Sequence, residues 1–227
     1  DAFAVFYADW GKADHNTGSR NFEKAMEKLY TQFPQDKEAA IFYALALRST
    51  ADPSDKTYKP QLAAGEILGK VYPGQPNHPG IVHYIIHCYD YPELAEKALV
   101  EARRYASIAP SSAHAQHMPS HIFIRLGLWQ ENINSNQVAA SSAVCYAQST
   151  GIKGHWDEEM HALDYVMYGY LQQGDNDSAK KQLQYVNNIK PVSPVNFKVA
   201  YAFAAIPSRY VLENKLWEEA ATLQLDT

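Results

Sequence analysis

The sequence predicts an all-α fold, an α-solenoid of about six antiparallel helix pairs stacked one on the next. Apolar residues recur at helical spacing, as at Phe22, Met26 and Leu29, and no run alternates polar and apolar residues between turns as strands do. Glycine and proline interrupt the chain at a period of about 34 residues, the length of a two-helix repeat. We therefore expect residues 1–227 to form a single helical-repeat domain.

The first two pairs are expected in residues 1–34 and 35–78. Residues 2–10 and 21–33 form the first predicted hairpin, which the turn-rich segment 12–20 joins and Pro34 ends. Residues 36–49 and 61–72 form the second around a loop with two prolines. His78 then precedes Pro79 and is expected to cap the next helix.

The clearest repeat unit covers residues 160–193. Gly174 lies where its first helix would close, Ala179 where its two helices would cross, and Pro191 where its second helix would end. This spacing resembles that of the tetratricopeptide repeat, a helix pair that stacks with its neighbours into a solenoid. The resemblance implies a concave face lined by the first helix of each pair.

The same register predicts the remaining units, 79–112, 113–159 and 194–227. Pro110 sets the first of them. The second has a first helix between Ala113 and the turn at Gly127, followed by an extended second helix over residues 130–147. The last unit contains Pro207, which suggests a kink.

Six of the nine histidines lie between residues 78 and 127. Helical spacings of i, i+4, i+7 and i, i+3, i+7 place two triplets each along one helix face: His83, His87 and Asp90, and His114, His117 and His121. In the tetratricopeptide register these residues, with His161, Asp164 and Tyr168, occupy the groove positions. The resemblance therefore implies that they converge in one concavity.

Neutral imidazole is the commonest metal-binding side chain, so this pattern predicts a transition-metal site for zinc, copper, nickel or iron. We expect His83, His87, His117 and His121 as ligands. Further ligands, or groups that orient them, are Asp90, His114, His161 and Asp164. Arg125 and Tyr168 are the candidates for substrate binding. The substrate would be a small molecule or peptide in the groove, and the sequence leaves open whether the site is catalytic.

Two other functions remain open. The groove could bind an extended peptide or a partner protein without any metal, as many tetratricopeptide arrays do. The histidines could also act as general acids and bases on a small substrate in a metal-free enzyme. Separately, Glu158 could reach the groove rim as a base. Glu158 and Glu159 could instead only complement the dipole of the helix that they begin.

Composition excludes several classes. A net charge of −5, spread without blocks of either sign, argues against a nucleic-acid partner. No run of eighteen apolar residues indicates a membrane span, so a soluble chain is expected. Because the sequence starts at Asp1, both a cytoplasmic chain and export after leader removal are open. Cys88 and Cys145 cannot form a disulfide framework, and both are expected to be buried.

Three segments carry a narrower resemblance: HPGIVHYIIHCYDYPELA, YASIAPSSAHAQHMPSHIFIRLGLW and MHALDYVMYGYLQQG. Their motifs HPGxxHYxIHxYD and HxxHMPSHIF are similar to those of a bacterial group of tetratricopeptide-like proteins. The similarity extends over about residues 35–190. It implies a bacterial origin and the helical-repeat fold, and it does not imply any particular reaction.

Overall fold

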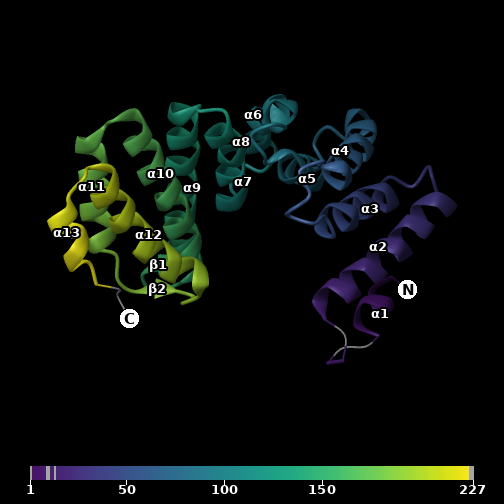
Figure 1. Cartoon of the computed structure of the whole chain (residues 1–227), viewed down its shortest axis with the longest axis horizontal. Helices are drawn as coiled ribbons and strands as arrows, with labels where there is room; N and C mark the ends of the chain where they lie inside the picture. The colour runs from purple at the N-terminus through teal and green to yellow at the C-terminus, as the bar shows by residue number, and fades with distance from the viewer. Residues whose placement is uncertain (1, 9–10, 13, 225–227) are drawn as a thin grey trace. The chain divides into compact units, whose positions relative to one another are not determined.

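The structure, a computed structural model, describes residues 2–8, 11–12 and 14–224. Within this part the chain is helical apart from its loops and two strands of two residues each, which confirms the all-α prediction (Figure 1). The chain divides into two compact units, Asp1–Glu101 and Ala102–Thr227. The single array of six repeats stays a prediction.

The first unit is built from helices whose ends follow the local sequence. They are α1 (Ala2–Tyr7), α2 (His15–Gln32), α3 (Lys37–Ser49), α4 (Lys59–Val71), the short η1 (Tyr72–Gly74), α5 (Pro79–Tyr89) and η2 (Ala95–Ala98). The side chain of His78 caps α5 by accepting a hydrogen bond from the Ile81 N–H at 3.2 Å, as expected. Helix α6 (Leu99–Ile108) begins in this unit and ends in the next.

The second unit holds the remaining elements. They are α7 (Ala113–His117), α8 (Pro119–Arg125), α9 (Trp129–Thr150), β1 (His155–Trp156), α10 (Asp157–Gln173), α11 (Asn176–Asn187), β2 (Val192–Ser193), α12 (Phe197–Glu213) and α13 (Trp217–Thr222). The two short strands pair in parallel, with His155 opposite Val192.

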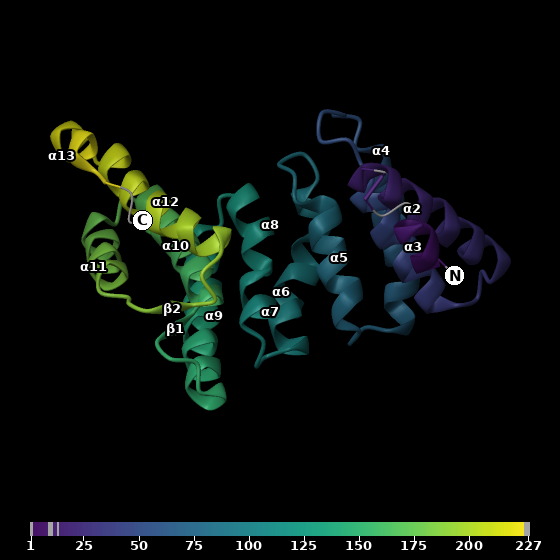
Figure 2. The same cartoon turned by 90° about the horizontal axis from the view of Figure 1, so that it is seen from below.

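Helix α10 is the centre of the second unit. It lies beside α9 and also packs against α11 and α12 (Figures 1 and 2). Its buried Met160 and Met167 join a core with Val186 of α11 and Ile206 of α12. Helix α10 also contacts α7, so it is held by neighbours on several sides.

Most predicted helices are present, and the local predictions differ from the structure at three points. The helices expected at residues 36–49 and 61–72 agree with α3 and α4 to within two residues at each end. Helix α2 begins at His15 instead of residue 21, because the Asp14 side chain caps it by accepting from the Thr17 N–H at 2.8 Å. The helix expected between Ala113 and Gly127 is broken into α7 and α8, since Pro119 has no N–H to continue the ladder.

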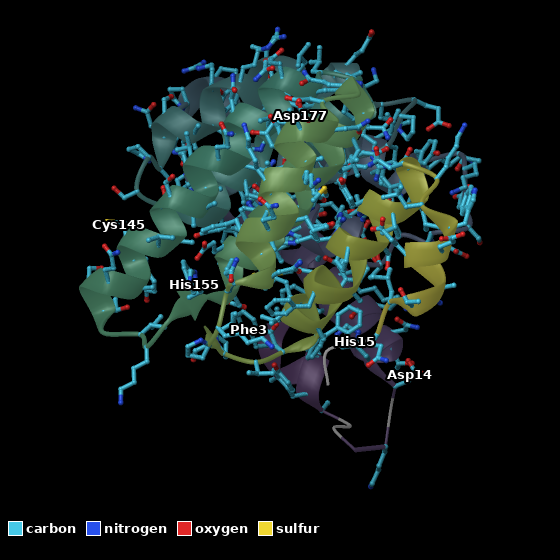
Figure 3. All side chains as sticks on the ribbon, turned by 90° about the vertical axis from the view of Figure 1, so that its left-hand side faces the viewer. Phe3, Asp14, His15, Cys145, His155 and Asp177 are labelled. Carbon is cyan, nitrogen blue, oxygen red and sulfur yellow. The ribbon has the colours of Figure 1, made fainter. Side chains whose placement is uncertain are left out.

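The third difference concerns the cysteines. Cys88 is buried, as expected, and burial raises the pKa of its thiol to about 12. Cys145 is exposed on α9, so its prediction was wrong (Figure 3). It lies two residues from each of the buried Ala143 and Ala147, which places it on the opposite side of the helix.

Membrane insertion has no support in the described helices, none of which has the length and hydropathy to cross a bilayer.

Candidate metal centre

Three histidines of the second unit form a compact cluster. His117 ends α7, His121 lies in α8 and His161 lies in the second turn of α10. Their ligand nitrogens all lie within 4.8 Å of one another, and Nε2 of His117 is 3.1 Å from Nε2 of His121. His117 is 1% exposed and the other two are partly buried.

The spacing of these nitrogens fits a metal ion. A tetrahedral zinc with nitrogen ligands at about 2.0–2.1 Å needs nitrogens about 3.3 Å apart. The separations here reach at most 4.8 Å, so the rings would have to move closer to bind one ion together. Three protein ligands also leave a fourth position open, as in catalytic zinc sites. The cluster could therefore hold a metal ion.

A buried amide network fixes the orientation of His117. Nδ1 of His117 lies 2.7 Å from Oδ1 of Asn136 on α9. The Asn136 amide nitrogen donates to the backbone oxygen and to Oδ1 of Asn132, at 2.9 and 3.0 Å, so Oδ1 of Asn136 is the acceptor. Nδ1 of His117 must then carry the proton, and Nε2 presents its lone pair to the cluster.

The same network joins α9 to α10. The Asn132 amide nitrogen donates to the Tyr165 carbonyl at 2.8 Å. The helices come close there because position 169 is glycine: a Cβ on Gly169 would lie 2.6 Å from Ile133 and 2.7 Å from the Asn132 amide nitrogen. The tyrosine ring itself packs against all three imidazoles, with centroid distances of 4.6, 5.6 and 5.4 Å to His117, His121 and His161.

Sequence reasoning missed Asn132 and Asn136. Both are fully buried. Their signal was the presence of two asparagines at i, i+4 inside a helix, where asparagine competes with the backbone and needs a specific partner. The partner lies on another helix and could not be read from the spacing.

Burial favours the neutral form of two of the three rings, His117 and His161. It holds the pKa of His117 well below its ordinary value, and the neighbouring His121 and His161 lower it further. Burial also lowers the pKa of His161 to about 4. Neutral imidazole is the form that binds metals, so near neutral pH these two rings need not lose a proton to bind one.

The lowered pKa values predict an acid-sensitive fold in the metal-free protein. An unfolded histidine titrates near pH 6.5, so below that pH the unfolded chain binds protons that His117 and His161 of the folded chain do not bind. We expect the free energy of unfolding to fall by up to about 1.4 kcal/mol per pH unit for each of His117 and His161 between about pH 6.5 and 4.5. For His161 the loss ends near its folded pKa of about 4.

Urea unfolding in EDTA at several pH values between about 7.5 and 5, the range in which histidines titrate while carboxylates stay mostly ionised, measures this slope. His161→Gln should reduce the slope by about half, because one of the two histidines no longer titrates. A free energy of unfolding that stays constant over this range would contradict neutral burial of both rings.

His114 lies at the edge of the cluster, and its ring centroid is 6.2 Å from that of His117. It is exposed, and its Nδ1 lies 3.7 Å from Oε2 of Glu158. Glu158 also bonds Lys198, whose amine lies 2.9 Å from Oδ2 of Asp157. The contact with His114 and then that with Lys198 lower the pKa of Glu158 to about 2, against its burial. A carboxylate this acidic is a weak base, which disfavours the general-base alternative for Glu158.

Asp164 is paired with Arg209 of α12. Its Oδ1 accepts from Nε of Arg209 at 3.0 Å and its Oδ2 from Nη2 at 3.4 Å. Burial raises the pKa of Asp164, and the nearby guanidinium of Arg209 opposes that rise. Tyr168 lies beside the same arginine, whose guanidinium carbon is 5.4 Å from the ring centroid. Arg125 is exposed in the last turn of α8.

The other predicted ligands belong to the first unit. His83 and His87 are neighbours on α5, with ring centroids 4.7 Å apart, and Asp90 follows the last residue of that helix. These residues lie in a different compact unit from His117 and His121, so the sharing of one ion by His83, His87, His117 and His121 stays a prediction.

No protein-family model matches the chain, and no similar sequence is found among curated proteins. The geometry alone therefore defines the class: an all-helical protein with a buried cluster of three histidines that could hold a metal ion.

Proposed function

We propose that the protein binds a transition metal ion through His117, His121 and His161 and uses it on a small molecule or peptide. The observation that supports this is the meeting of three imidazole nitrogens from three helices within 4.8 Å. Zinc, copper, nickel and iron all accept imidazole ligands, so the donor set does not select among them.

The bound metal would polarise a carbonyl group or lower the pKa of a water molecule at its open position. The chain's own residues would perform the other tasks. Asn136 fixes the tautomer and the ring orientation of His117 by accepting a hydrogen bond from its Nδ1, and the Tyr165 ring covers one side of the cluster. His114 lies at the exposed edge, where it could exchange a proton with solvent, and Glu158 holds it in place.

The wider proposal includes the fold. The chain would be a tetratricopeptide-like array of bacterial origin whose concave face carries the histidines. The turn glycines Gly127 and Gly174, both with positive φ, and the fully buried Ala179 support the repeat register. In that arrangement His83, His87 and Asp90 of α5 would complete or flank the metal site, as the sequence predicts.

Metal content tests this proposal. The protein, purified without a histidine tag and stripped with EDTA, is titrated with zinc against a competing chelator. We expect the wild type to bind about one ion per chain, and His121→Ala to weaken binding by more than about 100-fold, since a lost ligand costs more than a lost outer hydrogen bond. His15→Ala, an exposed histidine on α2, is the matched control and should bind as the wild type does.

Two outcomes are decisive. A protein that binds no zinc, copper, nickel or iron after reconstitution contradicts the proposal. If His87→Ala weakens zinc binding as much as His121→Ala does, the larger site that includes α5 is supported. If His87→Ala binds zinc as tightly as the wild type, the site is confined to the second unit.

One observation favours a second candidate function, a polar peptide-binding groove without metal. The 3.1 Å between the two Nε2 atoms of His117 and His121 also fits a hydrogen bond, so the rings can satisfy each other. This function predicts peptide binding that is unchanged by a chelator.

A further inference from the structure

A cavity of about 300 Å³ adjoins the histidine cluster within the second unit. Helix α10 contributes His161, Asp164, Tyr165 and Tyr168 to its wall, and α12 contributes Tyr201 and Arg209. Since His161 belongs both to the cluster and to this wall, a molecule in the cavity would lie next to a bound metal ion.

The wall follows one face of α10. His161, Asp164, Tyr165 and Tyr168 are spaced i, i+3, i+4 and i+7, so they form a single stripe. Asp164 follows His161 by three residues, so the two lie about 4.5 Å apart along the helix axis. Arg209, the partner of Asp164, lies at the Asp164 end. The cavity thus has a histidine end and an arginine end about one helical turn apart.

Arg209 supplies the charge at the second end. Its Nε and Nη2 bond Asp164, and Nη2 also donates to the Tyr201 hydroxyl at 3.1 Å. These are its hydrogen bonds to the described residues, so the two N–H groups of Nη1 are available to a ligand. A guanidinium matches a carboxylate in shape and charge. Because Asp164 already balances the charge of Arg209, the pair is neutral overall, so a ligand carboxylate would be held by the hydrogen bonds of Nη1 and not by a net charge.

The remaining wall suits an apolar body. Three tyrosines and Ile124 of α8 line it. The volume is at the small end of ligand sites, which are about 300–1,000 Å³. At about 30 Å³ for each non-hydrogen atom, as for liquid water, it holds a molecule of about ten such atoms.

We infer that this cavity binds a small organic monocarboxylate with an aromatic or similarly apolar body, whose carboxylate contacts Arg209. The opposite end of the ligand points to His161. This orientation toward a metal ion rests on the proposed function, whereas the contact with Arg209 does not.

Binding of matched probes tests the carboxylate contact. Isothermal titration compares 3-phenylpropionate with 3-phenylpropanamide, which has the same size and no charge, in EDTA. We expect the carboxylate to bind about tenfold more tightly or better, because hydrogen bonds to a charged group are roughly twice as strong as neutral ones. Equal binding of the two probes, or no binding of either, would overturn the inference.

A double variant locates the contact. Asp164→Asn with Arg209→Gln removes both charges together, so that no buried carboxylate is left unpaired. It should abolish the preference for the carboxylate. Arg103→Gln, which breaks an exposed arginine–glutamate pair elsewhere in the unit, should keep it. A preference that persists in a folded double variant counts against Arg209, and the wild-type comparison decides the matter if the double variant does not fold.

Zinc separates this inference from the proposed function. With zinc present, 3-(imidazol-4-yl)propionate should gain affinity and 3-phenylpropionate should not, because only the former has a metal-binding nitrogen at its far end. If zinc fails to bind but the carboxylate preference remains, the metal proposal fails and the Arg209 contact stands. If zinc binds and neither probe responds, the orientation toward His161 is wrong.

Discussion

Replacing Asn136 with leucine should weaken zinc binding by the histidine cluster by about 10- to 100-fold, the usual cost of losing the partner that orients a metal-binding histidine. Leucine cannot accept the hydrogen bond that Nδ1 of His117 makes at 2.7 Å. The imidazole can then rotate or change tautomer, and Oδ1 of Asn132 also loses a donor. The free energy of unfolding should fall by about 2–3 kcal/mol, because these groups are buried without partners. Chelator competition and urea unfolding measure the two effects.

Two further substitutions make this prediction specific. Asn136→Asp keeps an acceptor for His117, as carboxylates do in many zinc sites, and should bind zinc within about tenfold of the wild type. Asn134→Leu changes the exposed neighbour on the same helix and should leave zinc binding unchanged. If Asn136→Leu binds zinc as tightly as Asn134→Leu, the amide network has no part in holding the ligand.

Gly154→Ala should be among the most destabilising single changes in the second unit. Gly154 has φ of +88°, in the left-handed region that costs other residues about 1–2 kcal/mol. A Cβ there would also lie 2.2 Å from the carbonyl oxygen of Pro191, a backbone atom that cannot move aside without displacing β2. Overpacking adds about 1–3 kcal/mol, so we expect a total loss of about 3 kcal/mol or more in the free energy of unfolding.

Gly151→Ala is the matched control for this change. Gly151 ends α9 with φ of +74°, but nothing lies within 4 Å of the position that a Cβ would take, so alanine there should cost only about 1–2 kcal/mol. Urea unfolding followed by tryptophan fluorescence compares the two variants. Equal losses would show that the contact between Gly154 and Pro191 is not tight in solution.

The helices were largely predictable because they depend on local features. Apolar spacing gave α3 and α4, and the turn glycine Gly174 ends α10 where the repeat pattern placed it. The errors have local causes as well. The side chain of Asp14 starts α2 early, and Pro119 divides a helix that periodicity alone would continue.

The candidate site was predictable only in part. The one-face spacing of His117 and His121 was sufficient to pick them out, and the structure does bring their nitrogens together. His161 was expected only as a further ligand, yet it completes the three-histidine cluster of the described residues. Asp164 was expected as a further ligand or as a group that orients one, and the structure pairs it with Arg209, an arginine 45 residues away that no motif indicated.

The sequence by itself determined the fold class, the positions of most helices and the residue type that dominates the site, because helical periodicity and helix ends depend on residues within one or two turns. Only the tertiary structure decided which histidines meet, that Asn136 orients one of them, and that Arg209 neutralises Asp164. These choices depend on how α9, α10 and α12 pack against one another and on how α7 and α8 pack against α9. Such packing joins residues far apart in the chain, whose distances no local pattern contains.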